Sequence, residues 1–262
     1  MNYLDLNKKT WDAWAELHVN SEFYDIPSFL AGENSLHEIE LSLLGDINQK
    51  KLLHLQCHFG QDTLSLARMG ADVTGVDLSE KAISIAKSLA SQMNIDAQFV
   101  NCDIFDLKNH LQGQFDIVFT SYGTIGWLPE LNSWAQIISH FLKPGGTFVF
   151  VEFHPVMWMF DEQLDHVQYP YFVNEPIVET VTGSYADKES DVVRTHVTWN
   201  HSLAEVIQSL ISYGIEISRF SEYDYSLIDC FPGTEEYQPG RFRIKKYGNS
   251  LPMVYAIKGV KT

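Results

Sequence analysis

The chain has 262 residues, 45% of them hydrophobic, which is enough for one sizeable α/β domain. Its formal net charge of −16 argues against a nucleic-acid partner, because phosphate binding relies on clustered Lys and Arg. The apolar runs are too short to span a membrane, so no membrane partner is expected either. Met1 to Asp5 lacks the layout of a signal peptide, which predicts a cytoplasmic location.

The three cysteines, Cys57, Cys102 and Cys230, are odd in number and show no paired spacing. This predicts free thiols in a reducing compartment and no metal site. The one concentrated basic stretch, Arg241 to Lys246, is expected to form a solvated strand or loop face.

The first segment predicts two helices. Trp11, Trp14 and Ala15, followed by Leu17 or His18, recur at spacings of three and four between residues 7 and 18, which indicates an amphipathic helix. A second helix is expected from Ser35 to Leu44. The aromatic side chains of the first helix suit packing against the core, as buried Trp and Phe generally do.

The stretch from Lys51 to Lys81 predicts a strand, a tight turn, a helix and a second strand that ends on Asp77. An acid at this place can accept both hydroxyls of a ribose. Dinucleotide-binding turns carry three glycines, but Gln56, His58 and Gly60 stand in those places here. A pyrophosphate would meet side chains, so the pattern favours a nucleoside without phosphates over NAD.

Further alternating strands and helices follow. Ser79 is expected to cap a helix, and each strand should deliver the residues after it to the sheet edge that holds Gly60 and Asp77. The expected elements are a strand at 95–100, a strand at 115–120, a helix at 134–141, a turn at 143–146 and a strand at 147–153.

Beyond Pro155 the composition becomes aromatic and irregular. Residues 155–200 predict an insertion that caps the open edge of the sheet, with a hairpin around 178–185 and 192–199. A helix that starts after His201 and two final, nearly antiparallel strands at 215–225 and 253–260 are expected to follow.

The run LQCHFGQDTLSLARMGADVTGVDLS and the later turn LKPGG resemble class I S-adenosylmethionine-dependent methyltransferases over residues 50–152. The family's first motif, Asp-Leu-Gly-Cys-Gly-x-Gly, corresponds to His54 through Gly60, with departures at His54, Gln56 and His58. The sequence of this stretch is similar to that of a bacterial branch of the family that carries Gln-Cys-His-Phe-Gly and has small-molecule or unassigned substrates.

The resemblance implies a doubly wound, Rossmann-like, seven-stranded sheet that is mostly parallel, with a C-terminal antiparallel strand, N-terminal helices and an inserted cap. In this family an N-terminal extension often folds over the cofactor. We expect a single methyltransferase domain over 1–262, divided into an N-terminal helical extension (1–48), a cofactor-binding core (50–154), a substrate cap (155–200) and a C-terminal helix with closing strands (201–262).

The resemblance also implies which residues hold S-adenosylmethionine and its product S-adenosylhomocysteine. The first turn should surround the carboxypropyl chain, Asp77 should hold the ribose, and the segment after the third strand should meet the adenine. For Asp77 the alternative role is a helix cap before Ser79. The candidate cofactor-binding residues are Gln56, Cys57, His58, Gly60, Asp77, Leu78, Cys102, Asp103, Ile104, Ser121, Tyr122 and Gly123.

Methyl transfer from a sulfonium is an in-line displacement, so the protein mainly aligns the reactants and excludes water. A base is needed only when the acceptor arrives protonated. His154 is the first candidate, because it follows the fifth strand and precedes a proline; Tyr122 and Glu152 come next. A structural, hydrogen-bonded role for His154 is the alternative.

The leading interpretation is a methyltransferase that acts on a small molecule held under the cap. Two alternatives stand beside it: a non-catalytic binder of S-adenosylmethionine or S-adenosylhomocysteine, and a nucleotide-dependent oxidoreductase, which the missing glycines disfavour. The sequence leaves open the acceptor atom and the oligomeric state.

Overall fold

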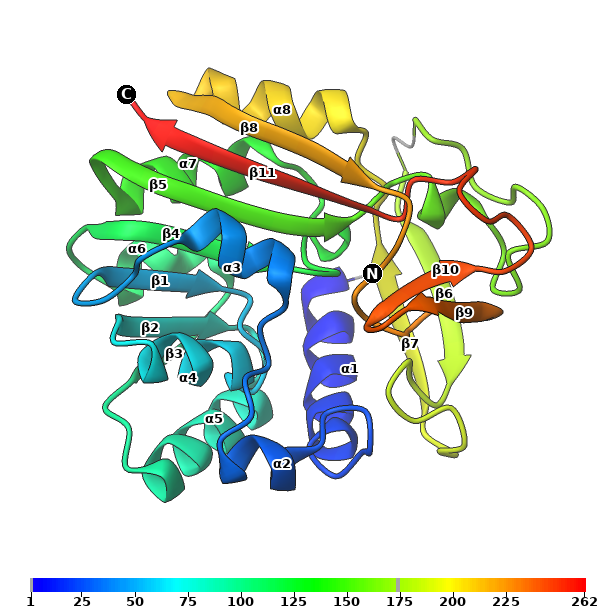
Figure 1. Cartoon of the computed structure of the whole chain (residues 1–262), viewed down its shortest axis with the longest axis horizontal. Coiled ribbons are helices and arrows are strands. Elements are labelled where there is room, and N and C mark those ends of the chain that lie inside the picture. Colours follow the sequence, from blue (N-terminus) through cyan, green and yellow to red (C-terminus); the bar gives the residue numbers. More distant parts are fainter. Residues whose placement is uncertain (1, 173–174) are drawn as a thin grey trace.

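A 7-stranded sheet of order β3-β2-β1-β4-β5-β11-β8 forms the centre of the computed structural model, which describes residues 2–172 and 175–262 (Figure 1). The pairs among β1 to β5 are parallel, whereas β11 runs antiparallel to both β5 and β8. The predicted fold class is confirmed. The strands are β1 (Lys51–Leu55), β2 (Asp72–Asp77), β3 (Gln98–Asn101), β4 (Phe115–Ser121), β5 (Leu142–Phe153), β8 (Ile215–Tyr223) and β11 (Val254–Lys261).

Helices cover both faces of the sheet. On β5, Phe148 and Phe150 pack toward Trp134 on one face, while Val149 and Val151 pack toward Leu43 on the other. This alternation follows from the two-residue period of a strand that is buried on both sides. The helices are α1 (Tyr3–His18), α2 (Ile26–Ala31), α3 (Glu38–Leu44), α4 (Gln61–Arg68), α5 (Glu80–Met93), α6 (Leu107–His110), α7 (Asn132–Phe141) and α8 (Leu203–Ser212).

Two antiparallel hairpins lie beside the sheet. The first joins β6 (Ile177–Thr182) to β7 (Val193–Thr198), close to where the sequence predicts a hairpin in the cap. The second joins β9 (Thr234–Gln238) to β10 (Arg241–Ile244). β10 lies in the basic stretch that was expected to form a strand or loop face, whereas its pairing with β9 was not predicted. In Figure 1, α1 stands between the sheet and these hairpins.

Two local features differ from the expectations. The short helix α2 lies between the two helices predicted for the first segment, where no helix was expected; the Asp25 side chain caps it, accepting from the Ser28 N–H at 3.2 Å. The predicted turn at 143–146 falls inside β5. Phe115 pairs with Leu142 and Ile117 with Thr147, so these residues are looped out between two paired positions.

The basic stretch on β10 carries ion pairs. Arg241 lies 2.6 Å from Glu38, and Arg243 lies 2.5 Å from Asp224. These contacts agree with the expected solvated role rather than with a phosphate-binding surface. Within the described part of the chain, no helix combines the length and the apolar character needed to cross a bilayer.

Candidate functional site

A cavity of about 1050 Å³ opens at the carboxyl ends of the parallel strands. All twelve candidate cofactor residues line it. In open α/β sheets ligands bind at this edge, so the topology brings together residues that are distant in sequence. We call the part lined by the ends of β1 to β4 the sheet-edge side, and the part lined by α1, the β6–β7 hairpin and Trp127 the cap side.

The first turn keeps a glycine-like backbone without the glycines. The φ angles of Gln56, His58 and Gly60 are 55°, 52° and 77°, all in the left-handed region. Residues with a side chain occupy this region at a cost of about 1 kcal/mol or more each. Gly60 alone is sterically required, because a Cβ there would lie 2.7 Å from the Phe99 ring. The turn geometry therefore persists despite the substituted motif.

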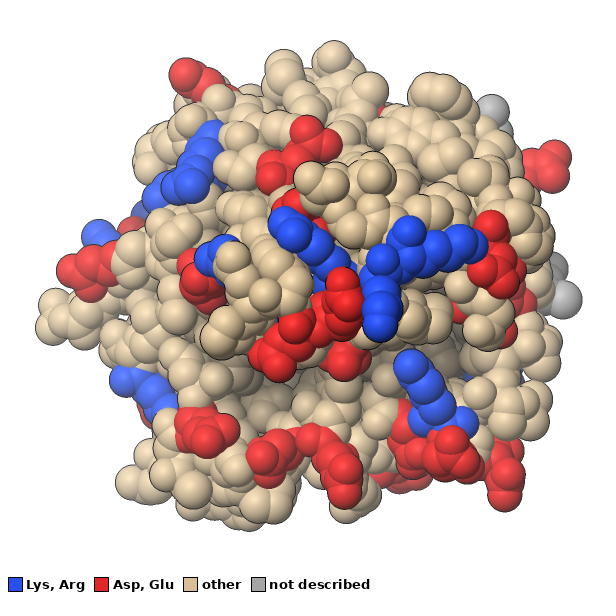
Figure 2. Space-filling model, turned by 45° about the vertical axis from the view of Figure 1, so that its right-hand side comes forward, with Lys and Arg blue, Asp and Glu red and all other residues tan. Residues whose placement is uncertain are grey.

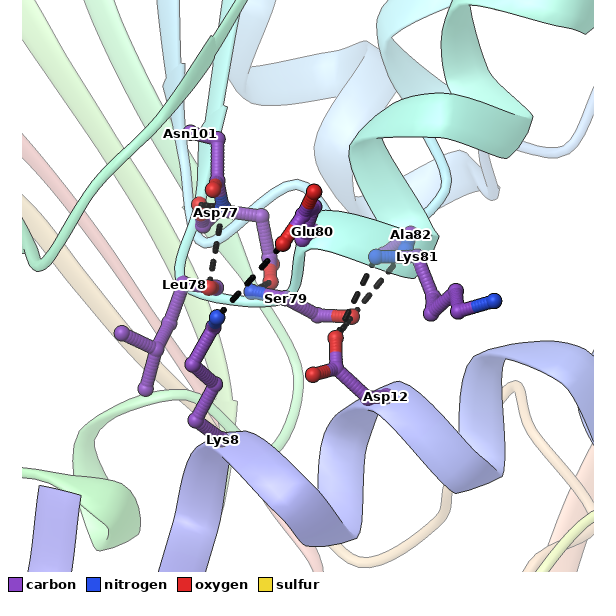
Figure 3. A network of polar contacts seen from close by, with 9 residues as sticks. All are labelled: Lys8, Asp12, Asp77, Leu78, Ser79, Glu80, Lys81, Ala82 and Asn101. Atoms are coloured by element: carbon purple, nitrogen blue, oxygen red, sulfur yellow. Dashed lines mark hydrogen bonds and ion pairs between the residues drawn. The ribbon is translucent and has the colours of Figure 1, made fainter. Parts of the chain in front are cut away.

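Asp77 accepts hydrogen bonds through both carboxylate oxygens. Oδ2 accepts from the His58 N–H of the first turn at 2.8 Å. Oδ1 accepts from the Ser79 N–H at 2.8 Å (Figure 3). The helix cap is Ser79 itself, whose hydroxyl accepts from Ala82 N–H at 3.0 Å and donates to Asp12 at 2.7 Å. Each Asp77 oxygen keeps a further lone pair. Burial raises the pKa of Asp77 to about 6.

Two side-chain atoms of the first turn are buried without a hydrogen-bond partner in the described ranges. Gln56 donates from Nε2 to the Thr124 carbonyl at 2.8 Å, but its Oε1 has no hydrogen-bond partner among the described residues. The Nε2 atom of His58 is likewise buried and unbonded there. Because buried polar groups are generally hydrogen-bonded, these atoms fit a polar cofactor at this turn.

Two further carboxylates line the sheet-edge side and were missed in the sequence. Asp62 accepts from the Ser121 hydroxyl at 3.4 Å, and Glu40 accepts from the Tyr122 hydroxyl at 3.3 Å. Burial raises the pKa of Asp62 to about 6 and that of Glu40 to about 7. Neither forms an ion pair with a Lys or Arg within the described ranges. Such carboxylates suit a positively charged ligand.

Glu152 fastens the loop after β4. Its carboxylate accepts hydrogen bonds from the backbone N–H groups of Gly123, Thr124, Ile125 and Phe153, of which the Thr124 bond is 2.7 Å long. Burial raises the pKa of Glu152, and these donors offset part of that effect. The side chain is fully engaged, so its geometry suits positioning of the loop rather than proton transfer.

The other two candidate catalytic residues differ in position. Tyr122 lines the cavity, and its hydroxyl points to Glu40. His154 is not among the lining residues; its Nε2 lies 2.9 Å from Glu222, and its Nδ1 accepts from the Val156 N–H at 3.2 Å. The expectation that His154 reaches the binding edge is therefore corrected: the turn at Pro155 directs the imidazole toward β8.

Aromatic rings build the cap side. The Trp11 ring centroid lies 5.0 Å from that of Trp127 and 5.3 Å from that of His58. The hydroxyls of Tyr24 and Tyr185 are 2.5 Å apart. The aromatic residues of α1 thus form a wall between the first turn and the cap, in addition to packing against the core.

Almost all charged residues that line the cavity are acidic. Lys188 is the one Lys or Arg among the described lining residues, whereas acids come from both sides of the cavity. In Figure 2, acidic side chains gather on either side of a hollow in the molecular face. This arrangement favours neutral or positively charged ligands.

The chain is similar to known methyltransferases. A family profile described as "Methyltransferase domain" matches residues 52–146. An uncharacterized methyltransferase of Synechocystis is 35% identical over 186 residues, covering 69% of this chain and 84% of the relative. The ubiquinone biosynthesis O-methyltransferase of Bordetella avium is 31% identical over 108 residues, which cover 41% of this chain and only 44% of that enzyme.

Solved structures share the fold. The S-adenosylmethionine-dependent methyltransferase of Mesorhizobium loti aligns with a TM-score of 0.58 at 18% identity, covering 88% of this chain and all of that protein. At this identity the likeness concerns the arrangement of strands and helices alone.

Proposed function

The chain belongs to the class I S-adenosylmethionine-dependent methyltransferases, and from this premise we propose that it methylates a small organic molecule held between the sheet edge and the cap. The observation that carries the proposal is the first turn, which keeps its left-handed backbone, carries two buried side-chain atoms without a hydrogen-bond partner in the described ranges, and is bonded to Asp77 through the His58 N–H. The cavity volume of about 1050 Å³ lies just above the range of about 300–1,000 Å³ that is typical of a ligand pocket, so it suits a cofactor plus an acceptor.

We assign the sheet-edge side to the cofactor. Asp77 and Leu78 hold the ribose, Cys102 to Ile104 meet the adenine, and the first turn with Ser121 to Gly123 surrounds the methionine portion. We add Asp62 and Glu40, whose carboxylates line the sheet-edge side and can balance the positive charge of the cofactor. We keep the division into a core at 50–154 and a cap at 155–200 as part of this proposal.

When bound, S-adenosylmethionine supplies a methyl group on a positively charged sulfur. The chain's own contribution is alignment and exclusion of water. Glu152 fixes the loop that carries Trp127, and α1 closes the cavity from the side of the cap. Tyr122 shapes the boundary between the two sides through its bond to Glu40.

The finer assignments are also part of the proposal. We place the chain in the bacterial branch with a Gln-Cys-His-Phe-Gly motif and in the cytoplasm. The free thiols of Cys57, Cys102 and Cys230 agree with a reducing compartment. The net charge of −16 favours a small-molecule acceptor over a nucleic acid.

Calorimetry with S-adenosylmethionine, S-adenosylhomocysteine and NAD tests the proposal. We expect binding of the first two and none of NAD. Asp77→Ala should weaken binding about 10- to 100-fold, because hydrogen bonds to a charged group contribute about 1.5–3 kcal/mol. Asp72→Ala, at the exposed start of the same strand, is the matched control. Failure of the wild type to bind either methyl donor or product would refute the proposal.

A further inference from the structure

We propose that Glu40 and Asp62 make the site select the positively charged methyl donor over the neutral product of the same reaction. The inference rests on the proposed function, since it takes S-adenosylmethionine as the donor and S-adenosylhomocysteine as the product. It begins from two carboxylates that line the sheet-edge side of the cavity without a basic partner in the described ranges.

The two ligands differ by one methyl group and one charge. S-adenosylmethionine carries a positive charge on sulfur. When the methyl group leaves, the electron pair of the carbon–sulfur bond stays on sulfur, so S-adenosylhomocysteine is neutral there. The adenosine, ammonium and carboxylate groups are the same in both, and contacts with them contribute equally to the two affinities. Selectivity is a difference of affinities, so it depends mainly on the electrostatic potential that the protein creates at sulfur.

Asp62 and Glu40 contact the same segment from two different helices. Asp62 lies at the start of α4, two residues after Gly60, and accepts a hydrogen bond from the Ser121 hydroxyl at 3.4 Å. Glu40 lies in α3 and accepts from the Tyr122 hydroxyl at 3.3 Å. The charge of Asp62 contributes to the raised pKa of Glu40, so the two carboxylates lie near each other. Both therefore contact the segment that we assign to the methionine portion, which includes the sulfur.

The protein does not compensate these two charges. Glu40 is 1% exposed, and burial raises the pKa of Glu40 to about 7 and that of Asp62 to about 6. A carboxylate with a basic partner usually shows a lowered pKa instead. The one Lys or Arg among the described lining residues is Lys188, in the cap segment. Keeping both carboxylates ionised therefore costs free energy, and a bound cation reduces that cost.

The neighbouring titratable groups bring no positive charge near neutral pH. Burial lowers the pKa of two histidines, which are therefore neutral, and raises the pKa of the other groups, which are neutral or negative. The histidines are His37 and His54, and the other groups are Tyr24, Cys57, Tyr122 and Glu152. The potential beside the pair is therefore negative, which favours a positively charged sulfur over a neutral one.

Three cations lie on or against the helices that carry the pair, but each is bonded elsewhere. Arg241 lies 2.6 Å from Glu38, Lys258 donates to the Leu43 carbonyl at 2.6 Å, and Arg68 donates to the carbonyls of Glu33 and Phe29. The negative charge of Glu40 and Asp62 therefore remains available to a ligand.

A second role for the pair would not distinguish the two ligands. The methionine portion also carries an ammonium group, and carboxylates bind such groups through charge-assisted hydrogen bonds. Donor and product share this group, so loss of a carboxylate that binds it would weaken both ligands by the same factor. Loss of a carboxylate that acts on sulfur weakens the donor alone. The ratio of the two dissociation constants separates these roles.

The first test is calorimetry with each ligand at pH 8, where both carboxylates are ionised. We expect the wild type to bind S-adenosylmethionine about tenfold more tightly than S-adenosylhomocysteine. Asp62→Asn and Glu40→Gln each keep an oxygen for the hydroxyl bond but remove the charge. The first should reduce the ratio about tenfold and the second several-fold, through weaker binding of the donor. Glu162→Gln, an exposed carboxylate that also lines the cavity, is the matched control and should leave the ratio unchanged.

The outcomes separate the inference from the proposed function. A wild type that binds the product as tightly as the donor, or variants that weaken both ligands equally, would overturn the inference and leave the proposed function intact. A wild type that binds neither ligand would refute the proposed function instead. The melting temperature of each ligand-free variant shows whether it folds, and the two single variants are independent of each other.

The second test counts the protons released on binding, by calorimetry at about pH 6.5 in two buffers that differ in ionisation enthalpy. Part of the pair is protonated at this pH, because the pKa values are about 6 and about 7. A nearby cation favours the ionised carboxylates, so the donor should release protons on binding and the neutral product fewer. The double variant Asp62→Asn with Glu40→Gln should remove the difference. Equal proton release with both ligands in the wild type would also overturn the inference.

Discussion

The two sides of the cavity are built in different ways. On the sheet-edge side, local bonds shape the first turn and the segment after β2: Gly60 N–H donates to the Cys57 carbonyl at 2.9 Å, and Asp77 accepts from Ser79 two residues later. Longer-range bonds, such as that from Tyr122 to Glu40, then join these segments. On the cap side, Asn7 bonds to Val197 across 190 residues of sequence, and Trp14 Nε1 donates to the Gly183 carbonyl across 169. The first side depends on motif chemistry and the second on tertiary docking.

This contrast suggests a division of labour. In this chain the first turn and the acid Asp77 are short motifs that local sequence specifies. An acceptor differs between enzymes, and a separate hairpin docked on α1 can vary without disturbing the sheet. Glu152 lies at the boundary, since its carboxylate holds the loop that bears Trp127.

The largest effect is expected where the two sides meet. Glu152→Gln places an amide NH₂ group against backbone N–H donors and should lower the free energy of unfolding by about 3 kcal/mol, while weakening S-adenosylmethionine binding. Urea denaturation and calorimetry measure the two losses. Glu216→Gln, exposed on β8, is the control. An unchanged urea midpoint would contradict a structural role for the boundary carboxylate.

A smaller effect should be confined to the cap side. Asn7→Ala leaves the buried N–H and carbonyl of Val197 without partners and should cost about 2 kcal/mol. We expect hydrogen exchange to accelerate in β7 much more than in β1. Asn109→Ala, which removes an exposed bond to Asp106, should change neither. Uniform acceleration across both strands would show that the two sides are not separate.

On the sheet-edge side, Asp62→Asn should weaken S-adenosylmethionine about tenfold, because it removes a negative charge near the bound cation. The same change should raise the melting temperature of the ligand-free protein at pH 8. Burial lifts the folded-state pKa of Asp62 to about 6, so keeping it ionised above that pH costs stability. Scanning calorimetry measures both quantities, with the exposed Asp96→Asn as the control. Loss of affinity without a gain in stability would leave the charge argument unsupported.

The smallest effect concerns pH. The pKa of Glu40 is about 7 and those of Asp62 and Asp77 are about 6, all raised by burial. Protonation removes negative charge, so affinity for the positively charged donor should fall several-fold as pH decreases from 8 through this window. Titration calorimetry at a series of pH values measures the slope, which Asp62→Asn should reduce. Affinity that stays constant over this range would exclude these carboxylates from cation binding.

The sequence predicted the sheet and the cofactor side because their signals are local. Strand and helix periodicity, the Ser79 cap and the acid at Asp77 each depend on a few adjacent residues. The missed elements, α2 with 6 residues and β9 with 5, are too short to show a clear periodic pattern. Glu40 and Asp62 were missed because no motif marks a carboxylate whose role depends on burial.

The sequence by itself determined that alternating strands and helices bring Gly60, Asp77 and Asp103 to one edge. Only the tertiary structure decided that His196 lines the cavity and that His154 does not. The turn after β5 directs His154, the sequence candidate, to Glu222, whereas cross-strand pairing with Glu179 and the bonds from α1 place His196 at the cavity. Side-chain direction at these positions depends on contacts with residues far away in the chain, and a local sequence pattern cannot predict such contacts.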